Sequence, residues 1–291
     1  MESKFKIAAL LTCHNRRDKT LLCLEALSHA ALMPGHKLDI YLVDDGSTDG
    51  TGEAVKSNFP EVNVIQGDGS LFWNQGMRLA WNTASQKAEY DFHLWLNDDT
   101  MLSSFALIEV FESYQEASDK DKQPAIVVGA CESSAGSNEF SYGGKDDSGP
   151  VVPNGKLQIC TYINGNVVLV SKAIFEKLGN LSNDYTHAMG DIDYGLRAIQ
   201  AGFICYTTRK YIAVCAKNDG IPAWCDPQTP ISKRWKLMNS PTGLNLKEYN
   251  TFRRKFWGWR WTIYTIKAYL KALMPGVYNK ANRKKSYDST S

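Results

Sequence analysis

Short apolar runs alternate with segments of helical spacing along the first 120 residues. The runs have the length and composition of buried strands, and they cover residues 4–13, 37–46, 62–67 and 90–100. The intervening segments repeat their apolar residues every three to four positions, which predicts helices over residues 17–32, 73–88 and 103–117 and a loop passing into a helix over 47–59. Alternation of this kind indicates a parallel sheet covered by helices on both faces.

The pattern loosens after residue 124. We expect further strands at 125–132 and within 203–215, a strand leading into a helix over 161–179, and a helix over 190–202. Residues 133–156 are rich in Gly, Ser, Pro and Asp, which predicts a long loop or hairpin region. Residues 216–251 have no clear period, and residues 252–274 are expected to form a helix.

Polar clusters follow three of the predicted strands where each strand ends. They are Thr12–Asn15, Asp44–Ser47 and Asn97–Asp99. Ligands of parallel α/β sheets bind outside the carboxyl ends of the strands. We therefore expect the three clusters to converge on one crevice.

Each carboxylate cluster has a structural and a functional interpretation. Asp44 and Asp45 either shape a tight turn or accept hydrogen bonds from a ribose or a base. Asp98 and Asp99 either cap a helix beside solvent or provide hard oxygen ligands for Mg²⁺ or Mn²⁺. Adjacent acids repel each other at a strand end, so a bound partner is the favoured interpretation for Asp44 and Asp45. For Asp98 and Asp99, taken alone, the two interpretations have equal weight.

A fourth acidic motif lies later in the chain, in GDIDYGLRA. Asp191 and Asp193 fall in the first turn of the helix expected there, where acids complement the helix dipole. The alternative is a general base beside the crevice.

Taken together, in this order and spacing, the motifs LLTCHNR, LVDDGSTDGT, WLNDDT and GDIDYGLRA resemble those of the family 2 glycosyltransferases over roughly residues 5–215. The stretch GDGSLFWNQGMRLAW is similar to bacterial rhamnosyl- and galactofuranosyltransferases of surface polysaccharide assembly. The resemblance implies the GT-A fold, a mostly parallel central sheet with helices on both faces. It implies a catalytic domain over 1–215, with a nucleotide-binding half over about 1–100 and an acceptor half over about 101–215, followed by a C-terminal extension over 216–291.

The resemblance also implies a role for each matching residue. Contacts to the nucleotide-sugar donor, UDP- or dTDP-linked, are expected from Thr12, Asn15, Asp44, Asp45, Asn74, Arg78 and Asp98. Asp99, with Asp98 beside it, would bind Mn²⁺ or Mg²⁺ at the leaving diphosphate, and Asp191 would deprotonate the acceptor hydroxyl, with Asp193 in support. The implied reaction is a single displacement that inverts the anomeric carbon.

Two departures from the family pattern concern the same site. Gly190 stands where relatives often have Glu, immediately before the expected base. Cys215 stands near the position where many relatives supply a His ligand, and a thiolate is poorly matched to Mg²⁺. His187 is an alternative ligand or acceptor contact, although a lone His is more often structural. Trp73 and Trp224 are candidates for stacking on an acceptor sugar, or for packing beneath loops.

The charge is distributed unevenly. The whole chain has a formal net charge of +2, but residues 253–291 alone carry ten Lys or Arg against one acid. Basic and aromatic residues mixed over 252–274 suit the cytoplasmic face of a membrane, where lipid-linked or glycan acceptors are found, or equally a helix packed on the protein. RNA or DNA binding is disfavoured, because no nucleic-acid motif accompanies the charge.

The seven cysteines are scattered with no C-x-x-C pair, which is typical of reduced thiols in a cytoplasmic protein. No secretory leader or bilayer-spanning run is visible in the sequence.

A sugar nucleotidyltransferase is disfavoured because LLTCHNRRDK has no glycine for a phosphate loop. An inactive carbohydrate- or nucleotide-sugar-binding scaffold stays as the main alternative to an enzyme, because Gly190 and Cys215 depart from the pattern.

Overall fold

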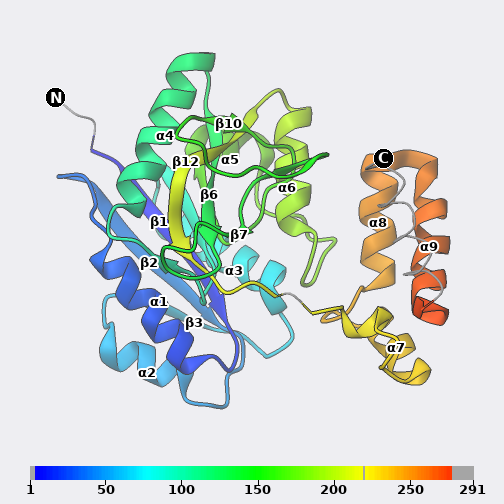
Figure 1. The fold of residues 1–291 in the computed structure, drawn as a ribbon. Helices are drawn as coiled ribbons and strands as arrows, with labels where there is room; N and C mark the ends of the chain where they lie inside the picture. Colours follow the sequence, from blue (N-terminus) through cyan, green and yellow to red (C-terminus); the bar gives the residue numbers. More distant parts are fainter. Residues whose placement is uncertain (1–3, 219, 277–291) are drawn as a thin grey trace. The chain divides into compact units, whose positions relative to one another are not determined.

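The computed structural model describes residues 4–218 and 220–276. These residues form two compact units (Figure 1). The first unit comprises the chain up to Asn183 together with Gly190–Lys217, and the second comprises Asp184–Met189 and the chain from Asn218 onward. The basic residues Lys280, Arg283, Lys284 and Lys285 lie outside the described residues.

The first unit is built on one mixed sheet, which has ten strands among the described residues. Its strands are β1 (Lys6–Cys13), β2 (Lys37–Asp44), β3 (Asn63–Gln66), β4 (Phe92–Leu96), β5 (Met101–Leu102), β6 (Ala125–Glu132), β7 (Phe140–Tyr142), β10 (Gln158–Ile159), β11 (Val167–Ser171) and β12 (Ile204–Val214). A separate small hairpin pairs β8 (Lys145–Asp146) with β9 (Gly149–Pro150), inside the segment expected to be a loop or hairpin region.

The strand order is β10-β12-β6-β11-β4-β1-β2-β3, with β5 beside β12 and β7 beside β6. Strands β4, β1, β2 and β3 run parallel, as the strand–helix alternation predicts. Strand β11 runs antiparallel to both β4 and β6. Its residues are all buried, so its sequence contains no alternation that could have indicated its direction.

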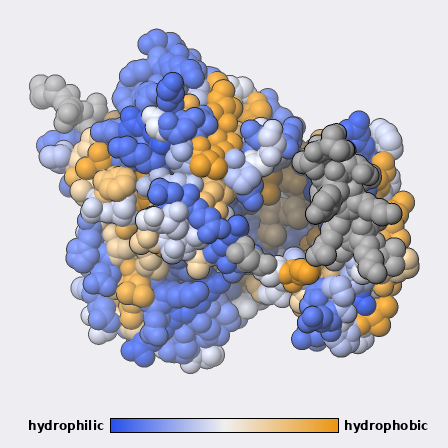
Figure 2. Space-filling view, viewed as in Figure 1, coloured by the Kyte–Doolittle hydropathy of each residue, from blue (hydrophilic) through white to orange (hydrophobic). Residues whose placement is uncertain are grey.

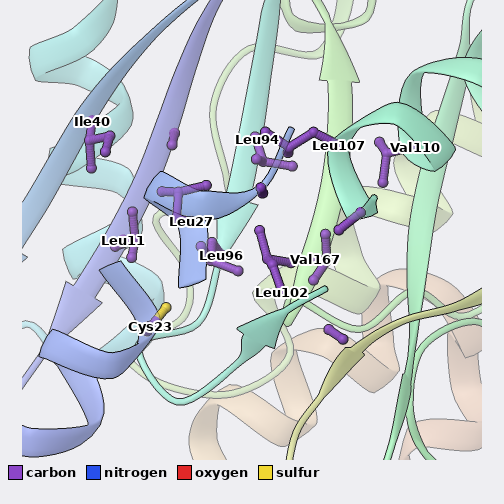
Figure 3. Close-up of a cluster of buried hydrophobic side chains, with 14 of the residues drawn as sticks. Leu11, Cys23, Leu27, Ile40, Leu94, Leu96, Leu102, Leu107, Val110 and Val167 are labelled. Atoms are coloured by element: carbon purple, nitrogen blue, oxygen red, sulfur yellow. The ribbon is translucent and has the colours of Figure 1, made fainter. Parts of the chain in front are cut away.

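Successive side chains of β1 enter two different cores, because side chains alternate across a strand. Ile7, Ala9 and Leu11 pack on the face that is covered by helices α1 (Arg17–His29), α2 (Thr51–Asn58) and α4 (Ala106–Asp121). Ala8 and Leu10 pack on the face that is covered by α3 (Phe72–Lys87), α5 (Lys172–Leu178) and α6 (Gly190–Gln200). Figure 3 shows the first of these cores, in which leucines and valines from α1, α4 and the central strands interlock.

The helices of the first unit lie close to the expected positions. They are α1 (Arg17–His29), α2 (Thr51–Asn58), α3 (Phe72–Lys87), α4 (Ala106–Asp121), α5 (Lys172–Leu178) and α6 (Gly190–Gln200). Strands β1, β2 and β4 run parallel, so their carboxyl ends and the three polar clusters that follow them lie at one edge of the sheet.

The second unit differs from the expectation in two respects. Residues 216–251 are not irregular throughout, because they contain η1 (Ala223–Cys225), α7 (Ile231–Met238) and the start of α8 (Leu246–Trp257). Residues 252–274 do not form one helix, because η2 (Gly258–Arg260) separates α8 from α9 (Trp261–Leu273). Gly258 has φ of +52°, a left-handed conformation that ends a helix and that glycine adopts readily. Within the described ranges, no helix is long and apolar enough to cross a bilayer.

Candidate active site

Arg16 joins the paired carboxylates that follow β4. Its Nη1 lies 3.0 Å from Asp98 Oδ1 and 3.0 Å from Asp99 Oδ2. Arg16 directly follows the cluster after β1, so the first and third polar clusters do converge. Thr20 in α1 adds a hydroxyl 3.4 Å from the other oxygen of Asp98. The guanidinium of Arg16 therefore bridges the carboxylates of Asp98 and Asp99.

The electrostatics of this pair are set by burial. Asp98 is buried and Asp99 is partly exposed. Burial raises the pKa of Asp98 to about 6, with a further increase from Asp99 and an opposing decrease from Arg16. Burial lowers the pKa of Arg16, but the two carboxylates outweigh it and the net shift is upward. The two neighbouring carboxylates, one of them buried, therefore favour a bound positive charge at this site.

The cluster after β1 also contacts the cluster after β2. Asn15 Oδ1 accepts hydrogen bonds from the backbone N–H of Thr48 at 2.7 Å and from its hydroxyl at 3.2 Å. The N–H of Asn15 donates to Ser47 Oγ at 2.9 Å. Asn15 has φ of +51°, a conformation that Asn tolerates better than most residues. Its observed role is to connect the two loops.

Asp44 and Asp45 are both buried and have internal partners. Asp44 Oδ1 accepts the N–H of Ser47 at 3.1 Å, which closes the turn. Asp45 accepts the N–H groups of Gly69 and Phe72, each at 2.8 Å, one on each carboxylate oxygen. Asp45 therefore positions the loop that leads into α3, and a ribose or base contact would use its remaining acceptor capacity.

Thr12 lies beneath α3, and Asn74 is part of α3. Thr12 is buried, and a side chain on Gly76 of α3 would overlap its hydroxyl. Asn74 is fully buried and its Nδ2 donates to the carbonyl of Ser182 at 2.9 Å. Both residues pack the floor of the site as the structure stands.

A short loop, Asn164–Asn166, connects the carboxylate pair with the acidic motif of α6. Asp191 Oδ2 accepts the N–H of Gly165 at 3.0 Å. Asn97, the residue before Asp98, donates its N–H to the carbonyl of Asn166 at 3.0 Å and pairs with that side chain at 3.2 Å. The two acidic groups are therefore parts of one connected site in the first unit.

Trp73 supports this loop from α3. Its Nε1 donates to Asn97 Oδ1 at 2.7 Å, and a side chain on Gly165 would overlap its ring. Its indole also packs edge-on against Trp95 with centroids 6.4 Å apart. Trp73 thus lies at the centre of the site, where it fixes the loop; stacking on an acceptor sugar stays a prediction.

Asp191 has the properties of a proton acceptor. It lies in the first turn of α6, half-buried, and its other oxygen accepts the N–H of Ile192 at 2.8 Å. Burial raises the pKa of Asp191, and the two N–H groups oppose that shift. A carboxylate with a raised pKa is a stronger base than an exposed one.

Asp193 and Arg78 have structural partners where ligand contacts were expected. Asp193 is fully buried and its Oδ2 lies 2.6 Å from Nε of Arg197. Arg197 also donates to the carbonyls of Leu178 and Asn180, so the pair fastens α6 to the loop after α5. The guanidinium of Arg78 donates to the carbonyl of Leu181 in the same segment. In this structure Asp193 faces the interior and Arg78 is directed to that loop, and the roles expected for them, in support of the base and at the donor, stay predictions.

Gly190 is explained by Asn74. A Cβ at Gly190 would overlap Asn74 Oδ1, so the amide fills the space that a larger residue before Asp191 would need. The Glu that is often found here in relatives is therefore sterically incompatible with Asn74 in this chain. The departure at Gly190 is a packing solution and does not by itself indicate an inactive site.

We expect Gly190→Ala to lower the free energy of unfolding by about 1–3 kcal/mol, because overpacking a filled interior forces neighbours to move. Combining it with Asn74→Ala should recover part of that loss, which a double-mutant cycle by urea denaturation would measure. Gly220→Ala is the matched control, since open space surrounds Gly220. Additive effects of the two first-unit substitutions would contradict the steric coupling.

The donor set around Asp99 fits a metal only in part. Cys215 Sγ lies 3.8 Å from Asp99 Oδ1, and burial raises the pKa of this thiol to about 11. Sulfur is a soft ligand that matches Mg²⁺ poorly, so Cys215 adds little to a site for that ion. No group of three or more His, Cys, Asp or Glu side chains within 4–218 and 220–276 could enclose an ion. Mg²⁺ is commonly bound by one or two carboxylates with substrate phosphates and water, and Asp99 with Asp98 fits that mode.

His187 and Trp224 belong to the second unit. Trp224 packs against its small core, which contains Met238 and Leu246. The first unit alone contains the carboxylate site, so an acceptor role for these two residues stays a prediction.

Sequence reasoning missed three contributors, Arg16, Gly165 and Asn166. Arg16 stands in the quoted motif LLTCHNR, and its charge beside two acidic clusters was a usable signal. Asn166 donates to Thr100 Oγ1 at 2.9 Å and to Cys215 Sγ at 3.2 Å, which gives Cys215 a packing role next to the acids. An Asn-Gly-Asn turn before a strand is too common to have indicated this.

Solved structures share this fold. A mannosyltransferase from Pyrobaculum calidifontis, PcManGT, in complex with GDP-Man and Mn²⁺, aligns with a TM-score of 0.55 and 15% identity over 98% of this chain and 81% of its own. Residues 1–349 of S. aureus TarS in complex with UDP align with a TM-score of 0.54 and 14% identity over 88% of this chain and 73% of theirs. The first unit therefore has the GT-A fold of glycosyltransferases.

A family model matches part of the sequence. Residues 9–142 match the model described as Glycosyl transferase family 2, so this part of the chain is similar to that family. A stretch of 109 residues is 28% identical to the poly-beta-1,6-N-acetyl-D-glucosamine synthase of Staphylococcus aureus, in strains MSSA476 and MW2. That stretch is 38% of this chain and spans only a quarter of the length of those curated relatives (25%).

Proposed function

We propose that this protein transfers a sugar from a nucleotide-sugar donor to an acceptor hydroxyl, with metal assistance and inversion at the anomeric carbon. The observation that carries the proposal is the connection of two acidic groups, Asp98–Asp99 and Asp191, through the loop Asn164–Asn166 in a unit similar to family 2. In such a site, Asp98 and Asp99 would serve the leaving group on one side of the anomeric carbon, and Asp191 would serve the attacking hydroxyl on the other.

On the leaving side, Asp99 and Asp98 would hold Mn²⁺ or Mg²⁺. When bound, the ion would supply Lewis acidity to the departing diphosphate. Arg16 now neutralises the same two carboxylates, so donor and ion binding require it to release at least one of them. The released guanidinium is suited to the diphosphate, because arginine binds phosphate oxygens in pairs. Asn15, Asp44 and Asp45 keep the donor loops in place.

On the attacking side, Asp191 would accept the proton of the acceptor hydroxyl as that oxygen attacks. The N–H groups of Gly165 and Ile192 fix the carboxylate and stabilise its ionised form before the proton arrives. A single displacement by one oxygen nucleophile inverts configuration, as in inverting glycosidases with their base and water.

The substrates are proposed by class. The solved relatives bind UDP, UDP-GlcNAc or GDP-Man, which supports a nucleotide-sugar donor, and we propose a UDP- or dTDP-linked sugar. A rhamnosyl or galactofuranosyl donor stays a proposal from the motif resemblance. The acceptor is proposed to be a glycan or lipid-linked saccharide of surface polysaccharide assembly, reached from the cytoplasmic face of the membrane.

The test is thermal unfolding of the full chain with UDP-, dTDP- and GDP-sugars, each with and without Mn²⁺ or Mg²⁺. Ligand that binds only the folded protein stabilises it by about 2.7 kcal/mol at a hundredfold excess over Kd. We expect one nucleotide class to raise the melting temperature in the presence of metal, and Asp99→Ala to remove the metal-dependent part of that increase.

Asp119→Ala is the matched control, since Asp119 lies exposed on α4 and bonds only Gln115 in the structure. Equal metal-dependent stabilisation of wild type and Asp99→Ala would contradict the metal role of Asp99. No stabilisation by any nucleotide sugar would contradict the donor assignment. Donor binding without metal-dependent release of the nucleotide would favour an inactive binding scaffold.

A further inference from the structure

The second unit contains a cavity of about 360 Å³ that is lined by cations and aromatic rings. Its lining includes Arg253 from α8 and Lys267 and Lys271 from α9, and no carboxylate. The aromatic part comes from Trp224, Tyr249 and Tyr264, among others. Positive charge with apolar walls is suited to an anion that has an organic body attached.

Arg253 is held rigidly at this cavity. Its guanidinium carbon lies 4.3 Å from the ring centre of Tyr264 and 4.6 Å from that of Trp257. Its Nε is buried and bonds no described residue. Ring contacts compensate part of the charge, and Arg253 lines the cavity, so the cavity contains an anchored cation with which an anionic ligand could pair.

One face of α9 is apolar and exposed. Its large side chains recur every three to four positions and are 40–60% exposed: Ile263, Ile266, Leu270 and Leu273. Met274, just after the helix, and Trp259, just before it, extend the same face. Figure 2 shows hydrophobic surface along the α9 edge at the right of the view. We call this row of six residues the apolar stripe.

The two cavity lysines lie beside the apolar stripe. Lys267 lies four residues after Ile263 of the stripe, and Lys271 lies four residues after Lys267. Each step of four residues turns about 40° around the helix, so both lysines stand at the border of the stripe. The helix therefore places apolar, cationic and cavity-lining positions next to each other around its circumference. This is the arrangement of a helix that lies in a membrane interface, with its lysine ammonium groups at the level of the headgroups.

Charge favours an anionic membrane over a protein surface as the partner. No Asp or Glu occurs between residues 249 and 287, whereas this stretch contains ten Lys or Arg. A second copy of the same face would bring like charges together. The described residues contain no helix that could cross a bilayer, so contact by this surface would be peripheral.

We propose that α9 docks on an anionic membrane and that the cavity binds the phosphate headgroup of one of its lipids. The apolar stripe enters the acyl boundary, and Lys267, Lys271 and Arg253 contact the phosphate. Docking would bring the first unit to lipid-borne acceptors, but the inference does not depend on sugar transfer.

The test is sedimentation of the full chain with vesicles of phosphatidylcholine mixed with phosphatidylglycerol and with vesicles of phosphatidylcholine alone. Lys267→Gln combined with Lys271→Gln should lower partitioning into the anionic vesicles about 30-fold, because each lysine near such a surface contributes roughly a factor of five. Lys233→Gln combined with Lys236→Gln removes the same charge from α7, outside the cavity, and should have little effect. Ile266→Asn combined with Leu270→Asn should abolish partitioning.

Four results would overturn the inference. They are no partitioning of the wild type, equal loss in the two lysine variants, full competition by inorganic phosphate, and a wild-type dimer that Ile266→Asn with Leu270→Asn converts to monomer. The third would indicate a small-anion site and the fourth a self-association face. Nucleotide-sugar stabilisation of the lysine variants, measured in parallel, should equal that of the wild type and keeps this test separate from the donor assignment.

Discussion

Asp191→Asn is expected to lower kcat for sugar transfer about 10²- to 10⁴-fold, the usual contribution of a general base. The substitution keeps the size of the side chain and removes its ability to accept a proton. Donor stabilisation in thermal unfolding should persist, because Asp191 is proposed to act on the acceptor. Steady-state kinetics with purified protein would measure the effect, and a variant that retains wild-type kcat would exclude Asp191 as the base.

The pH dependence gives a second readout of the same residue. Burial raises the pKa of Asp191 above the ordinary aspartate value of about 3.9. The base works only when ionised, so activity is present above the raised pKa and is lost as the pH falls through it. The acid limb of kcat/KM in the wild type should therefore lie above the range of an exposed carboxyl, and the residual activity of Asp191→Asn should not follow that limb.

Arg197→Met is expected to lower the free energy of unfolding by about 3–5 kcal/mol, because it removes the cation that pairs with the buried carboxylate of Asp193. The methionine side chain keeps most of the apolar stem, so charge and hydrogen bonding are the main losses. The three observed bonds of Arg197, to Asp193, Leu178 and Asn180, would all be lost. Urea denaturation monitored by tryptophan fluorescence would measure the change.

Lys172→Met is the matched control. Lys172 pairs with Glu89 at 2.8 Å, but both side chains are exposed, and exposed pairs contribute about 0–1 kcal/mol. If both variants lost the same free energy of unfolding, burial of Asp193 would not explain the contribution of the Arg197–Asp193 pair to stability. A stable Arg197→Met protein with a raised KM for the acceptor would instead restore the acceptor role that the sequence suggests for Asp193.

The layered fold was predictable because its signals are local. The buried run 90–100 and the helical spacing of 73–88 each identify their element without reference to the rest of the chain. The antiparallel direction of β11 was not predictable, because a strand buried on both faces has the same hydrophobic pattern in either direction. The break at Gly258 was missed because glycine within an aromatic, basic stretch can continue a helix at moderate cost.

The candidate site was predictable at the level of clusters but not of partners. Asp98 and Asp99 were placed at a strand end by pattern alone, and their convergence with the cluster after β1 followed from topology. The cation between them, Arg16, depends on a rotamer that no spacing rule specifies. Likewise, Asp191 and Asp193 lie two positions apart on one helix, so their side chains point to different surroundings. The sequence does not tell which of the two faces the site and which faces the interior.

The division of the chain has a consequence for modular exchange. Asp184–Met189 belongs to the second unit, where Thr186 bonds Glu248 of α8 at 2.6 and 3.0 Å, yet the next residues are Gly190 and Asp191 of the first unit. The C-terminal helices are therefore not a simple appendage that recombination or truncation could replace at one junction. Grafting this unit between relatives would require the exchange of two segments at three junctions, and the middle junction, between Met189 and Gly190, lies beside the proposed base.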